Sequence, residues 1–433
     1  MNETRSIWDY GDIVERGLLE DLEMLAEHIS GRVLHINATY SGGGVAEILS
    51  SMIPLLKGLG VETEWNIIRG DDEFFSITKT FHNVLHGRVN GVVEVPVAHE
   101  PVSVLDDLKS EIGELTRRKE MFETYLHWNK INSEEMDLDS DFVFIHDPQP
   151  AALIDVKQRG KWVWRCHIDV SNPDPLVWNF LSESISKYDA SIFSTPMFAR
   201  PDLGIREFLV PPSIDPLSDK NIELSQGDID RVLDKYGICT DKPIITQVSR
   251  FDRLKDLPGV IDAYKLVKKR IDCQLILAGG VASDDPEGMG VYREVMEKAD
   301  GEEDIHVLLG SPPFSDIEIN AFQRASTIIM QKSLKEGFGL VVSEGLWKGK
   351  PVIGGATGGI PLQIVNDVTG YLVHSVDGAA FKIANLLKNP ELARRLGEAG
   401  KEHVRHNFLI TRHLKDYLLI MLSLENPSGT IRL

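Results

Sequence analysis

The stretch Lys335-Glu-Gly-Phe-Gly-Leu-Val-Val-Ser-Glu344 joins two segments of different periodicity. The apolar run 327–330 before it predicts a buried parallel strand, and the pattern over 340–347 predicts a helix. The two glycines let the backbone approach a ligand, because they carry no Cβ, and the helix start offers unpaired N–H groups. Glu336 and Glu344 lie roughly along one helix face, so they could bind two separated diols of one long ligand. The alternative is that Glu336 caps the helix and Glu344 is a solvated surface charge.

The length and charge of the chain limit what it can be. Its 433 residues suit two domains of about 200 residues each. The net charge is −20, from 46 basic and 66 acidic residues. It argues against a nucleic-acid partner and against a membrane partner, because an acidic surface repels phosphate backbones and anionic lipids. The sequence contains no run of 18 apolar residues, so we expect no membrane span. Residues 1–25 carry acids where a signal peptide needs bases, so we expect no signal peptide there.

The cysteines argue against a disulfide framework and against a zinc site. Cys166, Cys239 and Cys273 are widely spaced, and the chain has no Cys-x-x-Cys pair. This cysteine usage fits a reduced, cytoplasmic location.

Alternation of strands and helices predicts the fold class, α/β. Three prolines in 210–216 interrupt the alternation and mark a domain boundary. We therefore expect two Rossmann-like domains that face each other across a crevice, 1–215 and 216–406, with the last helices (407–433) packing back on the first domain. Prolines and glycines also break the pattern over 87–103, which predicts an excursion or a surface loop. The expected strands are 32–37, 61–68, 142–145, 162–164, 244–249, 274–278, 305–309, 327–331, 351–353 and 371–373.

A glycine loop follows the first expected strand. Gly42-Gly43-Gly44 precedes a helical pattern that runs to Leu56, as in the first half of a βαβ unit. The spacing is not G-x-G-x-x-G, so the dinucleotide-binding fingerprint is absent and a dehydrogenase is disfavoured. The loop still allows a phosphate or a sugar to approach the helix N-terminus. The alternative is a tight turn without a ligand.

Polar residues follow several expected strands. His146-Asp147 comes after 142–145, and His167 comes after 162–164. The carboxyl ends of parallel strands line one crevice, so these side chains should converge there. A lone histidine is more often structural, but two histidines at strand ends, each near an aspartate, favour a functional His167.

A basic pair follows the first strand of the second half. Arg250 and Lys255 lie in one loop of a strongly acidic protein, which makes them a candidate clamp for an anion such as a diphosphate. The alternative is a pair of surface bases neutralised by Asp252 and Asp256.

Together these motifs resemble those of the retaining glycosyltransferases of family 4, which have the two-domain GT-B fold. The resemblance spans nearly the whole chain. Within that family the chain is similar to the trehalose glycosyltransferring synthases of thermophilic archaea and bacteria. The similar segments are SGGGVAEIL (41–49), TKTFHN (78–83), HDPQPAAL (146–153), WRCHID (164–169), PPSIDPLS (211–218), ITQVSRFD (245–252) and DDPEG (284–288).

The resemblance implies transfer of glucose from a nucleoside-diphosphate glucose, such as UDP-glucose or ADP-glucose, to free glucose, reversibly, giving α,α-trehalose. It places the acceptor in the first domain and the donor in the second. It also assigns roles to matching positions. The implied catalytic residues are His167, Arg250, Lys255 and Glu336; the donor-binding residues are Gly43, Gly44, Gly337, Phe338, Gly339, Leu340 and Glu344; the acceptor-binding residues are Asp147 and Glu47.

The resemblance further implies no tightly bound cofactor or metal and no covalent nucleophile, and it leaves open stimulation by Mg²⁺ and a homodimer. Two positions depart from the family pattern: the stretch 87–103 is longer than expected, and Gln363 stands where many members carry an acid. Two other functions stay open. One is a retaining trehalose phosphorylase that uses glucose 1-phosphate, and the other is a nucleotide-sugar-binding protein without turnover.

Overall fold

The computed structural model describes residues 5–86, 104–281 and 288–426. Its contacts divide the chain into two compact units, each described here by itself. The N-terminal unit is Ala26–Val210 with Leu418–Leu433, and the C-terminal unit is Pro211–Tyr417 with Met1–Leu25. The stretch 87–103, expected as an excursion, lies outside the described residues.

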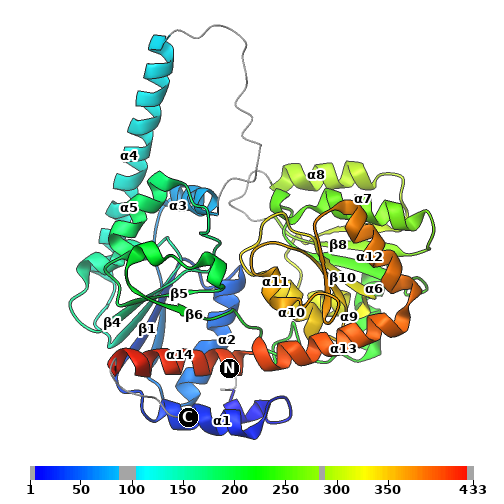
Figure 1. Ribbon diagram of the computed structural model, residues 1–433, viewed down its shortest axis with the longest axis horizontal. Helices are drawn as coiled ribbons and strands as arrows, with labels where there is room; N and C mark the ends of the chain where they lie inside the picture. Colours follow the sequence, from blue (N-terminus) through cyan, green and yellow to red (C-terminus); the bar gives the residue numbers. More distant parts are fainter. Residues whose placement is uncertain (1–4, 87–103, 282–287, 427–433) are drawn as a thin grey trace. The chain divides into compact units, whose positions relative to one another are not determined.

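The N-terminal unit contains a six-stranded, wholly parallel sheet in the order β2-β1-β3-β4-β5-β6 (Figure 1). The order reverses between β1 and β3, which makes the carboxyl ends of these two strands a topological switch point. The strands are β1 (Val33–Asn37), β2 (Thr63–Ile67), β3 (Phe142–His146), β4 (Lys161–Arg165), β5 (Ala190–Phe193) and β6 (Arg206–Leu209).

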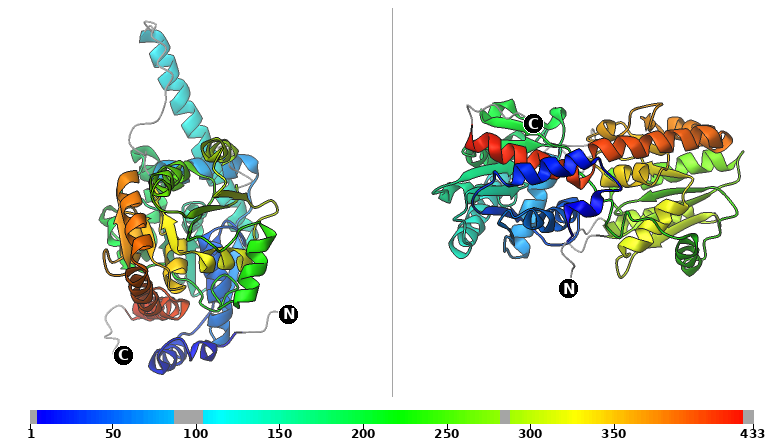
Figure 2. Two further views of the ribbon diagram at one scale, coloured as in Figure 1. Left: turned by 90° about the vertical axis from the view of Figure 1, so that its right-hand side faces the viewer. Right: turned by 90° about the horizontal axis from the view of Figure 1, so that it is seen from below.

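Helices bury alternate side chains of this sheet. Leu34, Val143 and Trp162 pack with apolar side chains of α3, α5 and η2 in one core. The long helix α4 reaches this core through Tyr125, and its first turns extend beyond the sheet (Figures 1 and 2). The helices are α2 (Gly44–Gly58), α3 (Asp72–Leu85), α4 (Val104–Glu135), η2 (Ala151–Val156), α5 (Pro175–Ile185), η3 (Pro196–Phe198) and η4 (Pro201–Leu203).

The C-terminal unit contains a second six-stranded parallel sheet, in the order β12-β11-β10-β7-β8-β9. Counted from β7, this is the Rossmann order 3-2-1-4-5-6, and its switch point lies between β7 and β10. The strands are β7 (Ile244–Val248), β8 (Gln274–Gly279), β9 (Ile305–Leu309), β10 (Ile328–Gln331), β11 (Val352–Gly355) and β12 (Gly370–Val373).

Both faces of the second sheet are buried. Leu275 and Leu277 of β8 pack with α7, α8 and α12, whereas Ile276 and Ala278 pack with α6 and α9, because successive strand side chains point to opposite faces. The longer helices are α6 (Gln226–Lys235), α7 (Leu257–Lys268), α8 (Gly288–Ala299), α9 (Asp316–Ala325), α10 (Leu340–Trp347), α12 (Val376–Lys388), α13 (Pro390–Asn407) and α14 (Ile410–Glu425); the short ones are η5 (Arg253–Lys255) and α11 (Ile360–Gln363).

The first residues of the chain are bound to the segment that opens the C-terminal unit. The hydroxyl of Tyr10, in η1 (Ile7–Tyr10), donates to Asp215 at 2.9 Å, and the Arg5 guanidinium donates to the same carboxylate at 2.7 Å. In α1 (Arg16–Ala26), Asp21 accepts a bond from Lys415 at 2.7 Å. These bonds explain why residues 1–25 group with 211–417.

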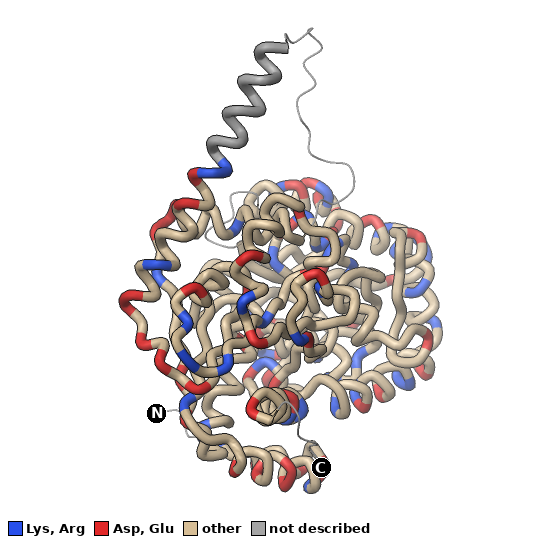
Figure 3. Tube along the Cα trace, turned by 60° about the vertical axis from the view of Figure 1, so that its left-hand side comes forward, with Lys and Arg blue, Asp and Glu red and all other residues tan. Residues whose placement is uncertain are grey.

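The sequence-based expectations match most of these elements. The ten expected strands are present with shifts at their ends. Two further strands, β5 and β6, did not stand out in the sequence. In the view of Figure 3 the Lys and Arg positions are interspersed with Asp and Glu. Within the described residues, every helix is too short or too polar to cross a bilayer.

Candidate functional site

The switch point of the C-terminal unit gathers polar side chains from two strand ends. β7 leads into the loop that carries Arg250 and Lys255, and β10 leads into the loop that carries Glu336. Because β7 and β10 pair directly, the two loops lie side by side. Ligands of open α/β sheets bind at such a position, outside the carboxyl ends of the strands.

A buried ion pair joins these two loops. The Lys255 ammonium donates to Oε1 and Oε2 of Glu336 at 2.9 and 2.7 Å. Oε2 also accepts bonds from the Gln331 amide and the Ser333 hydroxyl, each at 3.0 Å. Burial acts to raise the pKa of Glu336, but the charge and bonds of Lys255, with the two neutral donors, hold it below its ordinary value. Glu336 is therefore an ionised carboxylate inside the unit.

The two oxygens of Glu336 differ in what they can still accept. Oε2 has three donors, whereas Oε1 accepts from Lys255 alone among the described residues. A carboxylate oxygen has two lone pairs, so Oε1 keeps one position for a further donor such as a sugar hydroxyl. Glu336 does not cap α10, since Gly339 holds the N-cap position without a side-chain bond. The helix-cap alternative is therefore wrong for this residue.

Glu344 is buried rather than solvated, so the other half of that alternative is wrong too. Its side chain is 3% exposed, and its Oε2 accepts a bond from the Gln323 amide at 2.7 Å. The Lys220 ammonium lies 3.9 Å from Oε1. Burying a carboxylate costs much desolvation energy unless hydrogen-bond donors surround it. Oε1 of Glu344 has no donor within hydrogen-bond distance among the described side chains, so it can accept a bond from a ligand.

The glycine loop between the two glutamates is held by a second glycine pair. A Cβ on Gly358 would lie 1.7 Å from the Glu336 carbonyl oxygen, and its φ of +56° also favours glycine. The Gly359 N–H donates to the Gly337 carbonyl at 2.9 Å. The backbone at 337–339 is thus fixed by direct backbone packing, with Phe338 buried beneath it.

Gln363, which stands where an acid was expected, ties this loop to the helix that follows. Its amide group donates to the Phe338 carbonyl at 2.6 Å, and its Oε1 accepts from the Ser343 N–H and hydroxyl at 3.0 and 2.6 Å. An amide can donate on one side and accept on the other, which an ionised acid cannot. The departure from the family pattern therefore has a local structural reason.

The basic pair Arg250 and Lys255 is divided between two environments. Arg250 is largely exposed, with its guanidinium 3.7 Å from Asp252. Lys255 pairs with Glu336, whereas Asp256 forms an ion pair with Lys332. The alternative is therefore confirmed for the exposed Arg250, which pairs with Asp252, and is wrong for Lys255, which Asp256 does not neutralise.

Sequence reasoning missed several residues of this cluster. Lys332 is buried, and its backbone N–H donates to the Gln247 side chain at 3.1 Å. Gln247 in turn donates to the Lys255 carbonyl at 2.8 Å, so it holds the two loops together. The available signal was weak: Gln247 is a polar residue within the mainly apolar strand β7, and Gln331 ends the apolar strand β10.

Near the switch point of the N-terminal unit, His167 stands at the end of a row of three histidines. Nδ1 of His146 is 2.9 Å from Nε2 of His167, and Nε2 of His146 is 3.0 Å from Nδ1 of His35. His35 lies inside β1, His146 ends β3, and His167 follows β4. The sequence singled out His167; His35 and the bonds between the rings were not foreseen.

Asp147 holds the loop that carries His167. Its Oδ1 accepts the His167 backbone N–H at 2.8 Å, and its own φ of +66° is in the left-handed region. Burial raises the pKa of Asp147 to about 6, against the lowering effects of the His167 N–H and of Arg165. This carboxyl group therefore changes its charge near neutral pH.

The glycine loop of the N-terminal unit opens α2. Gly42 and Gly43 have φ values of +79° and +99°, and a Cβ on either would meet nothing within 4 Å. Gly43 is the N-cap of α2 and contributes no side-chain bond, so the first N–H groups of the helix face the loop. Gly44 begins the helix, and Glu47 lies half-buried in its first turn.

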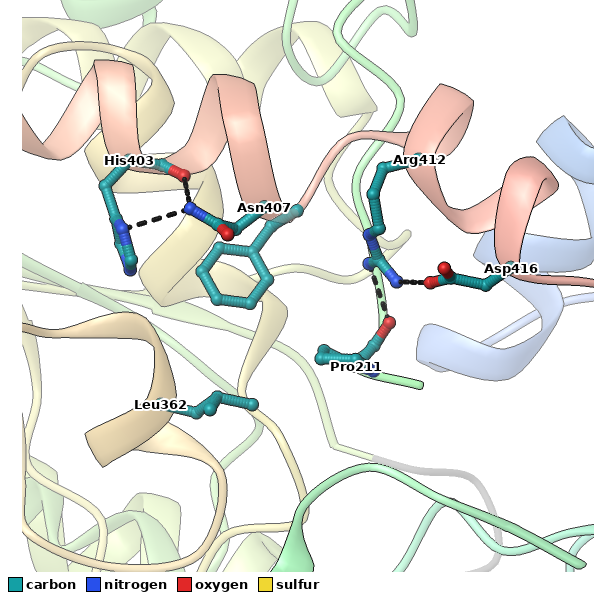
Figure 4. A pocket seen from close by; sticks show the side chains of 7 residues that line it. Pro211, Leu362, His403, Asn407, Arg412 and Asp416 are labelled. Atoms are coloured by element: carbon teal, nitrogen blue, oxygen red, sulfur yellow. Dashed lines mark hydrogen bonds and ion pairs between the residues drawn. The ribbon is translucent and has the colours of Figure 1, made fainter. Parts of the chain in front are cut away.

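A cavity of about 280 Å³ lies elsewhere in the C-terminal unit, at the junction of α13 and α14 (Figure 4). Arg412 bonds Asp416 at 2.5 Å and the Pro211 carbonyl at 2.8 Å beside it. The rest of the cavity wall is formed by Leu362, His403, Asn407 and Phe408. Phe408 contacts the Phe338 ring, with centroids 5.8 Å apart, so the cavity adjoins the support of the glycine loop.

A metal site is not apparent in the described part of the chain. No three or more His, Cys, Asp or Glu side chains there converge on a point that could hold an ion. The three cysteines are free, with Cys166 and Cys273 buried and Cys239 exposed.

Comparison with known proteins first defines the class. The E. coli trehalose-6-phosphate enzyme solved with UDP-2-fluoro glucose has a similar fold, with a TM-score of 0.68 and 13% identity over 93% of this chain and 100% of that one. The family "Glycosyl transferases group 1" matches residues 228–403. The two Rossmann-like units thus define a glycosyltransferase with the GT-B fold.

More similar relatives then define the family. The trehalose synthase of Pyrococcus horikoshii is 45% identical over 425 residues, which is 97% of each chain. That of Rubrobacter xylanophilus is 40% identical over 427 residues, also 97% of each. The family "Trehalose synthase, N-terminal domain" matches residues 35–110 and 107–200. This chain belongs to the trehalose synthase family.

Proposed function

We propose that this protein is a retaining glucosyltransferase of family 4 that forms α,α-trehalose from a nucleoside-diphosphate glucose and free glucose, reversibly. The observation that carries the proposal is the Lys255–Glu336 pair at the switch point of the C-terminal unit. It offers a cation for a diphosphate and a carboxylate for a sugar hydroxyl within one bonded group. The E. coli structure with the same fold was solved with a UDP-sugar, which supports the donor class.

In this proposal the C-terminal unit binds the donor. Arg250 and Lys255 hold the diphosphate, Glu336 accepts a hydroxyl of the donor glucose through Oε1, and Glu344 accepts the ribose diol. Gly337, Phe338, Gly339 and Leu340 offer backbone along the same ligand. Negative charge grows on the leaving diphosphate as the glycosidic bond breaks, so cations aimed at it stabilise the transition state more than the ground state.

The N-terminal unit provides the other groups of the reaction. We assign His167 to the reacting sugar, Asp147 and Glu47 to the acceptor glucose, and the Gly43–Gly44 backbone to the donor phosphate. None of these carboxylates is assigned as a nucleophile. The leaving phosphate accepts the proton of the incoming hydroxyl on the face from which it departs. An α-linked donor therefore gives an α-linked product, and the developing positive charge on the sugar acidifies the incoming hydroxyl, so a weak base suffices.

A trehalose phosphorylase is the second candidate, because glucose 1-phosphate would use the same sugar and phosphate contacts. Such a donor has no ribose, so it gives Glu344 nothing to bind. Glu344 is nevertheless buried with a dedicated bond from Gln323. This arrangement favours the nucleotide donor.

The test incubates the purified full chain with glucose labelled at C1 and either UDP-glucose, ADP-glucose or glucose 1-phosphate, with and without Mg²⁺. Trehalose and free nucleoside diphosphate are quantified, and NMR gives the anomeric configuration. Trehalose with both centres α and one diphosphate released per disaccharide is expected. Trehalose formed from glucose 1-phosphate but not from the nucleotide sugars would assign a phosphorylase. A β-linked product would refute the retaining mechanism. Trehalose formed from maltose without a nucleotide would refute glucose transfer from a nucleotide sugar.

A further inference from the structure

Three histidine rings form a continuous chain through the sheet of the N-terminal unit. His35 pairs in register with Phe144 and His146 pairs with Arg165, so each histidine lies two residues further along its strand than the one before. Side chains two apart point to the same face, which brings the rings together. Neighbouring ring centroids are 5.3 Å apart at both steps, with interplanar angles of 29° and 18°.

Hydrogen bonding between neutral imidazoles links their tautomers. A neutral ring has one N–H donor and one acceptor nitrogen. Both contacts in the chain join an Nδ1 to an Nε2, at 3.0 and 2.9 Å. If His146 donates through Nδ1, its Nε2 must accept from Nδ1 of His35; if it donates through Nε2, its Nδ1 must accept from Nε2 of His167. All three rings therefore carry their proton on Nδ1, or all three carry it on Nε2.

The surroundings keep the two inner rings uncharged. His35 is 0% and His146 is 2% exposed. Burial lowers the pKa of His35 to about 3, and burial together with the neighbouring His167, His35 and Arg165 lowers the pKa of His146 well below its ordinary value. The Phe144 ring stacks on the face of His35, with centroids 4.9 Å apart. Two neighbouring charged rings would place two N–H donors face to face.

We propose that His35 and His146 are positioning residues. They hold the His167 ring through its Nε2, and they fix whether its Nδ1 presents an N–H donor or a lone pair to the reacting sugar. The inference rests on the proposed function for the role of His167, but the chain itself does not. Starting from the form with every proton on Nδ1, a change of the His167 tautomer would require a proton to leave its Nδ1, one proton to shift in each of the two bonds, and another to arrive at Nε2 of the fully buried His35. The reverse change would require a proton to leave that buried Nε2. Burial of that far end opposes the change, so His167 stays in one form.

The first test is spectroscopic and needs no turnover. Full-length protein labelled with ¹⁵N-histidine is examined by long-range ¹H–¹⁵N NMR, with assignment from single histidine variants. We expect one tautomer shared by all three rings and a scalar coupling across each N–H···N bond. Unlike tautomers within the chain, or a His167 that averages between tautomers and titrates near the ordinary value of about 6.5, would overturn the proposal.

The second test uses variants that keep an aromatic ring but remove its nitrogen atoms. H146F removes both bonds, and H35F leaves the bond to His167 but removes the buried end of the chain. With H146F we expect His167 to show averaged tautomers and kcat to fall by about ten- to a hundredfold, as for a misplaced reacting group, while KM for the donor changes less. H35F should reduce kcat by a smaller factor.

The control is Tyr188→Phe, which removes another buried hydrogen bond in the same unit, from the Tyr188 hydroxyl to the Ala151 carbonyl at 2.7 Å. It should keep the wild-type His167 spectrum and kcat. An H146F protein with the wild-type spectrum and kcat would refute the proposal. If H146F does not fold, the tautomers seen in the wild-type spectrum still decide whether the histidine chain exists. A wild type that makes no trehalose would refute the proposed function, and the spectral test of the chain would remain valid.

Discussion

The ammonium group of Lys255 bonds both carboxylate oxygens of Glu336, although the two residues are 81 positions apart in the chain. The Lys255 and Glu336 side chains are only 16% and 9% exposed, so each charge depends on the other inside the protein. Arg250, in the same loop as Lys255, is 57% exposed and has no such dependence. Stability and catalysis should therefore respond differently to the loss of the two bases.

Lys255→Ala should lower both stability and activity. Removing one partner of a buried pair leaves the other charge uncompensated, which costs about 3–5 kcal/mol of unfolding free energy. Loss of a charge-assisted bond to the diphosphate, worth roughly 1.5–3 kcal/mol, should reduce kcat/KM by at least about tenfold. Denaturant unfolding and steady-state kinetics measure the two effects.

Arg250→Ala is the matched variant. Its activity should fall by a similar factor, about tenfold or more, while its unfolding free energy stays within about 0.5 kcal/mol of the wild type, as for an exposed side chain. Near-normal kcat/KM in both variants would refute the diphosphate clamp. Equal destabilisation by both would refute the asymmetry of burial.

Glu336→Gln and Glu344→Gln should separate chemistry from donor binding. Glu336 is assigned to the reacting sugar, so Glu336→Gln should lower kcat by about tenfold or more, because misplacement there harms the reacting geometry. Glu344 is assigned to the ribose, away from bond breaking, so Glu344→Gln should raise KM for the donor by up to about tenfold and change kcat less. Initial rates at varied donor concentration test both, and the reverse pattern would show that the two glutamates are placed wrongly along the ligand.

Gln363→Glu should destabilise the C-terminal unit despite its equal size. An ionised glutamate cannot donate, so the Phe338 carbonyl loses its 2.6 Å bond and faces a carboxylate instead. A buried group left unsatisfied costs about 1–3 kcal/mol, which thermal unfolding can detect. The control is Gln226→Glu on α6, where the amide is exposed and, among the described residues, bonds Asp230 alone. A Gln363→Glu protein as stable as this control would contradict the bridging role.

Asp147→Asn should remove a pH dependence of stability. Burial raises the pKa of Asp147 from 3.8 to about 6, so the folded state holds its proton in a range where the unfolded chain has lost it. The stability that this protonated group contributes is present below about pH 4 and is lost as pH rises through about 6, a change of roughly 3 kcal/mol. Asparagine keeps the acceptor for the His167 N–H and tolerates the left-handed backbone.

Unfolding free energies of both proteins at pH 4 and pH 7 give the measurement. Between pH 4 and pH 7 the unfolding free energy of the variant should increase relative to that of the wild type. A difference between the two proteins that does not change with pH would show that Asp147 ionises as an exposed aspartate does.

The sequence by itself determined the local elements and the polar side chains that follow them. Apolar runs of strand length separated by helical patterns predicted two Rossmann-like halves, because burial on both faces requires such runs in a parallel sheet. The strands β5 and β6 escaped detection for a related reason. β5 (Ala190–Phe193) is buried but includes a serine, and β6 (Arg206–Leu209) is an edge strand whose side chains are partly exposed, so neither carries a continuous apolar run.

Only the tertiary structure decided which of these groups meet. Lys255 reaches Glu336 because β7 pairs with β10, and this pairing follows from how the helices cover the sheet, not from any local pattern. Whether Glu344 was buried depended on α9, which supplies Gln323. The histidine chain depended on strand register: a shift of one residue would turn His146 to the opposite face of the sheet, away from His35 and His167.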